Sequence, residues 1–593
     1  MKKVFLWLII ISMVAVFPLV GCKAEVAEEE ETTPAEEEAT PAEEEKEALE
    51  IPLGFSYDPD MAAAILADAG YVDTDDDGFV EAPDGSKIEL SVTCPLGWTD
   101  WMESIKVIAK SAQDAGINIQ DETPDYGAWN SALTEGTFDM TLNNWAGMSN
   151  TPWTAYNIMF SHPIKDIMGG GNFGRYENAE VFDLVDQLAA TPTSDLEGMK
   201  AICSQIQTIH LKDMPVIPLW YNGLWAQMSN LVWTNWPSAA EDTPNYLPCT
   251  WAGYWQMGGL MMLTELELQE GVEPGTGTYP RDETIYISGA AWGPPTDWNP
   301  FITWSKANTS GTVGLIYETL FMYDPLTDEL IPWLAESGEW TDDVTYELKI
   351  REGITWSDGE AFTADDVKFT FEVGQQFPAI FYSKMWDYLT EVVKVDDYML
   401  QFNFTEPLYQ EWGNNLYNIA IVPEHLWADR TEEEVTSGMN EDPVGTGAYL
   451  YDTHSEDRSI YVKNDNWWAT DLLGLEVAPK RIVDIRCASN NIALGMVIKG
   501  EIDLSNNFLP GVTELVDKGY VQTYIPEAPY MLSANTVNLF LNTTKKPMDD
   551  PAFRKALAWA IDTDEIVRIA FADMVNVSDP TSLLPSLAKY VNY

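Results

Sequence analysis

The sequence predicts an α/β protein with two lobes, and three observations point to that fold class. At 593 residues the chain is longer than one hydrophobic core usually supports. Hydrophobic residues make up 46% of it and aromatic residues 12%, which is ample for globular cores. From residue 51 onward, short apolar runs alternate with stretches of helical periodicity. Such alternation implies α/β lobes that bind ligands at the ends of their strands.

The first predicted elements show this alternation in order. Residues 61–70 (MAAAILADAG) predict a helix that stops at its final glycine. Residues 88–94 alternate in polarity as a half-buried strand does. Residues 101–115 predict the next helix, and 138–142 predict a further strand.

The first 22 residues have the pattern of a secretory signal. A positive start, Met-Lys-Lys, is followed by an apolar run through Val20 that is short for a membrane span. The run ends in Leu-Val-Gly-Cys, which resembles the lipobox of bacterial lipoproteins. That resemblance implies that Cys22 is lipidated and becomes the first mature residue; an uncleaved anchor is the alternative. We therefore expect an extracytoplasmic protein with a lipid anchor in the cell membrane.

Residues 23–50 predict an extended tether. They contain thirteen glutamates and the repeat Thr-Pro-Ala-Glu-Glu-Glu, at 33–38 and again at 40–45. Like charges repel and proline stiffens the chain, so this segment cannot form a core. It would hold the folded part of the chain near a membrane and leave it free to sample its surroundings.

The net charge narrows the classes of ligand. It is −63 at pH 7, which argues against nucleic acid or anionic lipid because both need a basic face. The charge does not indicate which neutral ligand binds, and a strongly solvated surface explains it equally well. We expect a monomer with no nucleic-acid partner.

The sequence shows no catalytic constellation. Its four histidines are scattered without metal-ligand spacing, and there is no GxSxG elbow and no Walker A loop. Carboxylates are abundant, so a glycosidase-like pair stays open. We predict a protein that is not an enzyme and that needs no cofactor. Four further cysteines, separated by long stretches, allow either disulfides or buried thiols: Cys94, Cys203, Cys249 and Cys487.

One acidic loop has the spacing of a calcium site. Asp73, Asp75 and Asp77 alternate and are followed by a turn glycine, an arrangement that suits a hard cation. The glutamate expected at the twelfth position is absent, since Asp84 stands there. A structural calcium ion and an ordinary Asp/Gly turn are both open.

Three segments, at 348–369, 443–449 and 541–562, carry a family resemblance: LKIREGITWSDGEAFTADDVKF, PVGTGAY and LNTTKKPMDDPAFRKALAWAID. In this order they resemble the signature segments of family 5 solute-binding proteins, the oligopeptide-type receptors of bacterial ABC importers. The resemblance covers nearly all of 51–593. It implies a two-lobed periplasmic-binding-protein-like fold with an extra subdomain, which closes over its ligand and then docks on a permease.

The order of the two halves differs from that of the family. The half that resembles the family's C-terminal part comes first, so we interpret the chain as circularly permuted; a gene-fusion or assembly artefact would give a similar order. Permutation requires that residues near Ile51 and Tyr593 lie close together at the surface. The implied domains are the C-terminal half at 51–262, a linker at 263–281, and the N-terminal half at 282–593 with the subdomain at 326–444.

The resemblance also implies which segments form each lobe. We expect lobe one to combine 282–541 with 216–262, and lobe two to combine 542–593 with 51–215. Three elements are expected from the family pattern: a strand where the chain returns between the lobes at 216–220, the first strand at 284–288 and the first helix at 317–321.

The stretch from 138 to 153 indicates the class of ligand. In peptide-binding members the corresponding segment carries an aspartate that pairs with the peptide's α-ammonium. Here no acid occurs from Thr141 to Ser161, and the segment resembles that of the family's oligosaccharide-binding branch. Amide side chains both donate to and accept from sugar hydroxyls, and flat aromatic rings suit the apolar faces of a sugar.

By family position and chemistry, nine residues are candidates for the ligand site, although core packing is an alternative for every tryptophan. Trp356, Trp467 and Trp468 are left to the core or the surface. The candidates are Trp98, Asn143, Trp145, Trp292, Trp298, Asn299, Asn507, Phe508 and Asn542.

The sequence therefore predicts a substrate-binding lipoprotein of an ABC importer that captures β-linked oligosaccharides of the cello, manno or xylo type. The first alternative is an oligopeptide- or dipeptide-binding receptor of the same kind of importer. A sensor or adhesion lipoprotein that docks on no permease and a polysaccharide-active enzyme are alternatives from other classes.

Overall fold

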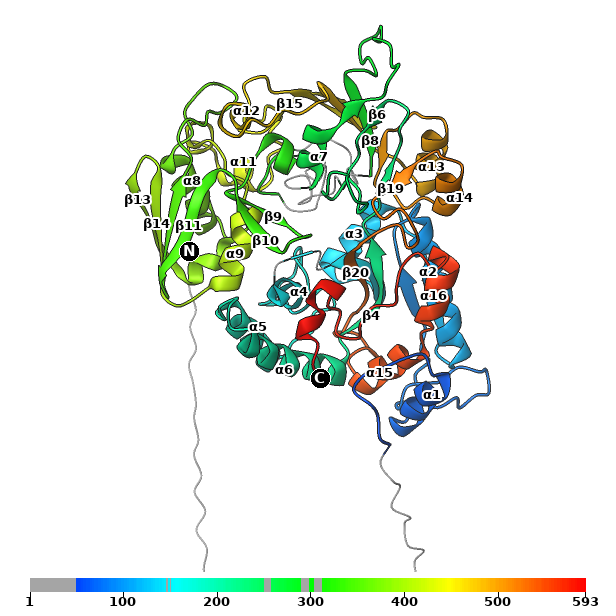
Figure 1. The fold of residues 1–593 in the computed structure, drawn as a ribbon. Coiled ribbons are helices and arrows are strands. Elements are labelled where there is room, and N and C mark those ends of the chain that lie inside the picture. Colours follow the sequence, from blue (N-terminus) through cyan, green and yellow to red (C-terminus); the bar gives the residue numbers. More distant parts are fainter. Residues whose placement is uncertain (1–48, 146–147, 150, 250–257, 290–297, 303–311) are drawn as a thin grey trace, which may run out of the picture. The chain divides into compact units, whose positions relative to one another are not determined.

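The structure, a computed structural model, describes residues 49–145, 148–149, 151–249, 258–289, 298–302 and 312–593 (Figure 1). All structural statements below concern these residues. Three sheets of four or more strands organise them, and the fold is mixed α/β, as the sequence predicts.

A five-stranded sheet draws its strands from both ends of the chain. Its strand order is β2-β1-β3-β20-β4, with β1 parallel to β2 and β3, and β20 antiparallel to both of its neighbours. The sheet is therefore complete only when the late strand β20 inserts between two early ones. The bounds are β1 Leu90–Thr93, β2 Ile119–Glu122, β3 Met140–Trp145, β4 Val216–Gly223 and β20 Ser533–Leu541.

The helices around this sheet also combine early and late segments. Helix α1 packs against α15, and α2 packs against α16, so early and late segments share one hydrophobic core. The bounds are α1 Pro59–Asp68, α2 Thr99–Asp114, α3 Tyr126–Glu135, α4 Pro152–Met159, α5 Ala179–Ala189, α6 Leu196–Asp213, α15 Pro551–Ala560, α16 Thr563–Phe571 and the 3-10 turn η5 Pro585–Tyr590.

A seven-stranded sheet has the order β15-β16-β17-β8-β18-β5-β19, and β8 runs parallel to β17 and β18. Its strands are β5 Gln227–Met228, β8 Thr284–Ser288, β15 Tyr449–Ser455, β16 Arg458–Lys463, β17 Arg481–Ile485, β18 Leu504–Ser505 and β19 Gln522–Thr523. Further elements of these chain regions are α7 Leu260–Glu265, α12 Trp468–Leu473, α13 Asn490–Ile498, α14 Val512–Asp517 and the pair β6 Trp233–Thr234 and β7 Glu267–Leu268.

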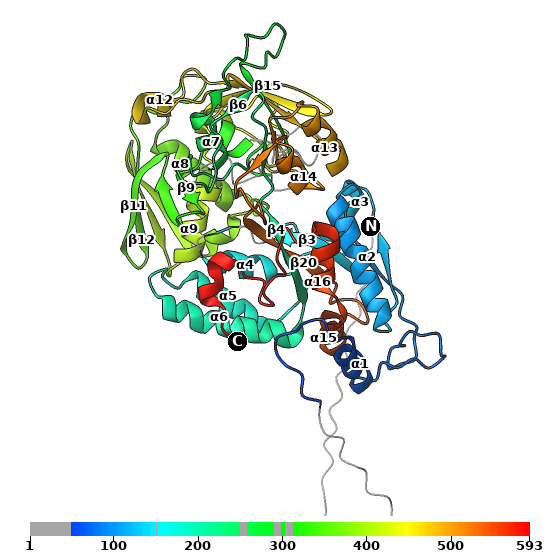
Figure 2. The same ribbon diagram turned by 45° about the vertical axis from the view of Figure 1, so that its right-hand side comes forward.

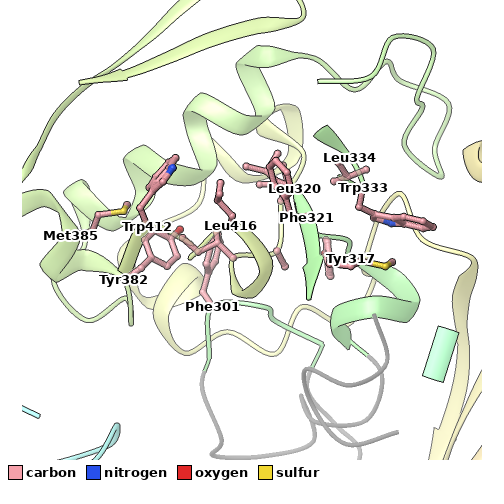
Figure 3. Close-up of a cluster of buried hydrophobic side chains, with 14 of the residues drawn as sticks. Phe301, Tyr317, Leu320, Phe321, Trp333, Leu334, Tyr382, Met385, Trp412 and Leu416 are labelled. Atoms are coloured by element: carbon pink, nitrogen blue, oxygen red, sulfur yellow. The ribbon is translucent and has the colours of Figure 1, made fainter. Parts of the chain in front are cut away.

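A four-stranded antiparallel sheet, β11-β12-β14-β13, lies within the range expected for the subdomain. Buried aromatic and aliphatic side chains pack beside it, among them Tyr382, Met385 and Trp412 (Figure 3). The elements are β9 Phe321–Asp324, β10 Glu329–Pro332, β11 Ala335–Asp342, β12 Thr345–Ile350, β13 Leu389–Asp396, β14 Met399–Phe404, α8 Ala364–Gln376, α9 Tyr409–Asn418, α10 Glu424–Trp427, α11 Glu432–Thr436, the π-helical turn η3 Thr312–Ile316 and the 3-10 turn η4 Ser383–Asp387.

The helix expected at 317–321 is absent. The turn η3 ends at Ile316, and strand β9 begins at Phe321. Between them Glu318 is 1% exposed, and its carboxylate accepts hydrogen bonds from three indole N–H groups. The helix expectation is wrong because these long-range contacts hold the segment, and a short sequence match does not show them.

The boundary expected between the lobes is also wrong. Strand β4 and strand β20 both pair within the five-stranded sheet, although we assigned 216–262 and 282–541 to lobe one. The apolar patterns of β4 and β20 suit either sheet, and only the pairing partner decides between them. The chain passes from one sheet to the other after Gly223 and again before Ser533, where the Leu224 amide donates to the Leu532 carbonyl at 2.7 Å.

Part of the expected linker is structured. Residues 263–265 complete α7, and β7 pairs with β6. The stretch without helix or strand runs from 269 to 283. The linker predicted at 263–281 from its Gly/Pro/Thr composition therefore overlaps this stretch but begins a few residues too early.

Residues near the start of the folded region lie against the last residue of the sequence. A Cβ placed on Gly54 would come within 3.3 Å of the Tyr593 hydroxyl oxygen. The main-chain amide of Asn592 donates to the side chain of Gln207 at 2.8 Å, which fixes this end on α6 (Figure 2). Among the described residues, no helix combines the length and apolar character needed to cross a membrane.

Candidate functional site

Three parallel strands of the five-stranded sheet end at one edge, where candidate ligand residues gather. Trp98 follows β1, Tyr126 follows β2, and Trp145 is the last residue of β3. In α/β sheets ligands bind at the carboxyl edge of parallel strands, because the loops there are free to vary and the strands hold them firmly. We therefore take this edge as one half of the candidate site.

Aromatic rings form a cluster at this edge, which we call the aromatic cluster: Trp98, Trp101, Tyr126 and Trp129. The Trp98 ring meets Trp101 edge-on at 4.8 Å and lies 6.2 Å from Tyr126 and 6.0 Å from Trp129. Trp101 and Trp129 are buried, whereas Trp98 and Tyr126 are partly exposed. The buried rings support two rings that keep an accessible surface, which is the arrangement an apolar ligand face needs.

Polar contacts fix the cluster to the sheet. The Trp129 indole N–H donates to Thr141 Oγ1 at 2.9 Å, and Thr93 Oγ1 donates to the same atom at 2.9 Å. Two residues further along β3, Asn143 is 4% exposed and lies opposite Asn538 of β20. Asn143 is thus on a rigid strand close to the site edge, and its amide is shielded from bulk water.

The seven-stranded sheet contributes an edge of its own. Strands β8, β17 and β18 are parallel and end at Ser288, Ile485 and Ser505. Asn507 Oδ1 accepts a hydrogen bond from Ser288 Oγ at 2.9 Å, and the Asn507 side chain is nearly buried. Phe508 packs edge-on against Trp225 at 5.1 Å. Both residues therefore brace the strand ends and the crossing between the sheets.

The two edges touch each other. Asn490, in the segment after β17, donates to Asp100 Oδ1 at 3.1 Å and to Thr99 Oγ1 at 3.2 Å. Gly97 has φ +95°, and a Cβ on it would lie 2.8 Å from the Ala488 carbonyl oxygen, so only glycine permits this approach. The loops after β1 and β17 are thereby held together.

Asp100 lies in this contact and is 5% exposed. Burial raises the pKa of Asp100 to about 6, although hydrogen bonds from main-chain amides and from Asn490 oppose that change. A carboxyl group that titrates near neutral pH thus lies where the two edges meet.

Three of the candidates from the sequence are structural. Trp298 is 1% exposed and packs 4.1 Å from Tyr451. Asn299 donates from Nδ2 to the carbonyl oxygens of Val435 and Gly438, both at 2.9 Å. Asn542 donates to the carbonyl oxygens of Gly136 and Phe138, again both at 2.9 Å. Their family position suggested a cleft role, but Trp298 packs in the core and the two asparagine amides join distant loops.

Two candidates lie outside what the structure describes. Trp292 falls in 290–297, and for Trp145 only the main chain is described, with Thr536 as its partner on β20. Sequence reasoning missed Tyr126 and Trp129. Their position on α3, directly after the short strand β2, is a signal that a search of every strand end would have used. Trp356, Trp467 and Trp468 are buried.

The acidic loop brings together a different set of carboxylates from the one the spacing suggests. Oxygen atoms of Asp73, Asp75 and Glu81 lie within 4.8 Å of one another. Lys87 Nζ bonds Asp75 at 2.7 Å and Asp77 at 2.8 Å. An ammonium group therefore already balances part of the charge that a cation would neutralise. Elsewhere among the described residues, Cys94, Cys203 and Cys487 are free thiols, and Cys249 is buried.

The two sheets meet at the carboxyl ends of their parallel strands and are joined by two crossing segments, an arrangement typical of proteins that bind a ligand between two lobes. Residues 25–166 and 329–593 match the sequence profile of bacterial extracellular solute-binding proteins, family 5 Middle. The chain belongs to this family, whose members are extracytoplasmic binding receptors and not enzymes.

Named relatives bind small peptides. The dipeptide-binding protein of Escherichia coli K12 is 25% identical over 304 residues, which cover 47% of this chain and 54% of that protein. The glutathione-binding protein GsiB of Shigella flexneri serotype 5b is 28% identical over 246 residues, 40% of this chain and 45% of the relative. The chain spans about half the length of the curated relatives it matches.

A solved structure is more similar in sequence. A periplasmic oligopeptide-binding protein of an oligopeptide ABC transporter from Thermotoga maritima, crystallised with mannohexaose bound, is 47% identical with a TM-score of 0.51. The match covers 52% of this chain and 57% of that one. A protein described as oligopeptide-binding thus holds an oligosaccharide in its crystal structure.

Proposed function

We propose that the protein captures β-linked oligosaccharides between its two lobes and delivers them to an ABC permease. The proposal rests on one observation: the aromatic cluster lies beside the end of strand β3, and the stretch that begins there has no acidic residue. Trp98 and Tyr126 offer partly exposed rings, and no carboxylate occurs in the sequence from Thr141 to Ser161. Rings bind the apolar faces of a neutral sugar, while a peptide's α-ammonium needs a carboxylate partner.

The Thermotoga structure supports the same ligand class, because its 47% identity accompanies a bound mannohexaose. Members of the family are extracytoplasmic, which agrees with a secreted receptor. We further propose that Cys22 carries the lipid anchor and that residues 23–50 are the tether. Sugars of the cello, manno and xylo series are the ligands to test.

A peptide receptor is the second candidate, favoured by the dipeptide- and glutathione-binding relatives. In that case the ligand's charged termini would need partners from parts of the site other than the end of β3. The two candidates predict opposite responses to neutral sugars and to peptides.

A thermal-shift panel of the purified protein tests the proposal. Cello-, manno- and xylo-oligosaccharides and mixed short peptides would be added singly. A ligand at about a hundred times its dissociation constant adds roughly 2.7 kcal/mol of stability, which raises the melting temperature by a few degrees. Stabilisation by sugars alone supports the oligosaccharide receptor. Stabilisation by peptides alone overturns it in favour of the second candidate.

A further inference from the structure

A three-residue polar contact joins the helices between β3 and β4 to the segment beside the four-stranded sheet. Lys384 Nζ lies 3.1 Å from His162 Nε2 and 3.3 Å from Asp186 Oδ1. His162 Nε2 also lies 3.3 Å from Asp186 Oδ2. Lys384 thus donates to Asp186 Oδ1 and to His162 Nε2, which accepts because the ring proton on Nδ1 faces the Phe160 carbonyl oxygen. The His162 and Asp186 side chains lie next to each other.

The partners come from different units of the fold. His162 follows α4, and Asp186 is on α5, in the connection between β3 and β4 of the five-stranded sheet. Lys384 is on η4, in the connection between α8 and β13 beside the four-stranded sheet. The contact therefore spans the interface between the helices of one sheet and the subdomain.

Both sides are anchored to rigid supports. The His162 ring stacks on Phe182 at 4.5 Å with an interplanar angle of 14°, and its Nδ1 lies 2.9 Å from the Phe160 carbonyl oxygen. On the other side, Met385, which follows Lys384 in the chain, is fully buried (Figure 3). Its sulfur accepts a hydrogen bond from Asn415 Nδ2 at 3.2 Å. Because both partners have fixed positions, forming the contact costs less side-chain entropy than an ordinary surface pair does.

Further contacts surround the three residues at the same interface. Burial alone would raise the pKa of Asp186, but its contact with His162 and the charge of Lys384 together lower it. Beside them, Gln410 Nε2 donates to the Thr191 carbonyl oxygen at 3.1 Å. Helices α4 and α5 both pack against α9, so the polar contact lies at the margin of a larger interface.

We propose that Lys384, His162 and Asp186 form a latch that holds the lobes closed and so sets the residence time of the ligand without touching it. The contact is present without a ligand, so it favours closed lobes in the free protein as well as in the complex. Opening must break the latch before the ligand leaves. Loss of the latch should therefore raise the dissociation rate, and it should not lower the association rate, because a ligand enters open lobes. The inference rests on the proposed function, because it requires a ligand held between the lobes.

The decisive variant is Lys384→Met, which keeps most of the apolar length of the side chain and removes the charge. Lys384→Arg serves as the rescue, since its guanidinium can bond both partners. Lys349→Met is the matched control. Lys349 forms an ion pair of 2.8 Å with Glu336 inside the four-stranded sheet and bridges no interface.

Stopped-flow tryptophan fluorescence with mannohexaose, or with the panel compound that stabilises the protein most, gives both rates. We expect Lys384→Met to raise the dissociation rate roughly three- to tenfold, as for a part-buried ion-pair network, with an association rate equal to or above that of wild type. The arginine variant should return to the wild-type rate, and the Lys349 control should match wild type throughout. An unchanged dissociation rate, or an equal fall in the association rate, would overturn the latch.

A second readout separates this inference from the proposed function. If the wild-type protein binds neither sugars nor peptides, the proposed function fails, and small-angle scattering of the ligand-free proteins then tests the latch. A larger radius of gyration for Lys384→Met than for wild type and for Lys349→Met would support it. Equal scattering of the three proteins would refute it.

Discussion

Tyr593 packs against Gly54, so the last residue of the sequence lies within a few residues of the start of the folded region. Strand β20, near the end of the sequence, completes a sheet whose other strands come from residues 90–223. Family and structural matches fall in two segments or cover about half of each chain. We infer that the chain is a circular permutation of the family's usual order.

The first prediction follows from this inference. A chain that starts at 282, runs to Tyr593 and continues through a short glycine linker into residues 51–262 should fold to the same structure. We expect its melting temperature and its oligosaccharide affinity to match those of the original order. Circular dichroism and calorimetry measure both. Failure of this chain to fold cooperatively would count against permutation.

Trp98 and Trp145 should carry ligand affinity. We expect Trp98→Ala to weaken sugar binding at least tenfold, and Trp145→Ala to abolish it, because each loss removes a stacking surface. Both variants should stay folded. Trp298→Ala is the contrasting control, since Trp298 is 1% exposed: it should lower the free energy of unfolding by about 3–5 kcal/mol. Titration calorimetry and thermal melts distinguish the two effects, and full affinity in Trp98→Ala would remove the aromatic cluster from the site.

Glu318 should be a stability determinant. Indole N–H groups of Trp333, Trp467 and Trp468 donate to its carboxylate at 2.9, 3.1 and 2.7 Å. Glu318→Ala leaves three buried donors without a partner, so we expect a loss of at least about 3 kcal/mol. Glu318→Gln keeps one oxygen and should lose less. Urea unfolding measures both, with the exposed Glu336→Ala as the neutral reference. A loss below about 1 kcal/mol for the alanine variant would contradict this role.

Asp100 should make stability depend on pH. Its pKa in the folded protein, about 6, lies above its ordinary value of 3.8. Protonation therefore favours the folded state, and the free energy of unfolding should fall as the pH rises from about 4 to about 6 and then level off. Asp100→Asn removes this dependence. Relative to wild type, the variant should gain roughly 2–3 kcal/mol between pH 4 and pH 7. Parallel pH profiles of the two proteins would disprove the assignment.

The acidic loop should behave as a turn and not as a calcium site. Lys87 already bonds Asp75 and Asp77, so we expect neither EDTA nor millimolar calcium to change the melting temperature. Lys87→Gln removes the ammonium group and leaves the carboxylates of Asp73, Asp75 and Glu81 within 4.8 Å. Calcium should therefore raise the melting temperature of this variant. A calcium-dependent shift of several degrees in the wild-type protein would favour the calcium interpretation.

Local patterns were reliable guides to local structure. The predicted helix at 61–70 matches α1, and the strand predicted at 284–288 is β8. Predictions failed where long-range contacts decide. The expected helix at 317–321 gives way to the buried Glu318 contacts, and the expected lobe boundary moves because β4 and β20 pair with strands of the other sheet.

The candidate site divides in the same way. Trp98 was predicted from family position and its aromatic chemistry, and the structure places it in the aromatic cluster. Asn299 and Asn542 were predicted from family position, yet their amides satisfy main-chain carbonyls of distant loops. An asparagine presents the same donors and acceptors in either role, so its residue type does not separate ligand contact from loop support.

By itself the sequence determined the fold class, the family and the acid-free strand end, because periodicity, motif order and charge are properties of neighbouring residues. The tertiary structure alone decided that β20 lies between β3 and β4, that Tyr593 meets Gly54, and that Lys384 reaches His162 and Asp186. These contacts join residues far apart along the chain. The free energy that stabilises these contacts comes from burial and strand pairing after the sheets have formed. No local sequence pattern indicates which distant residue will be the partner.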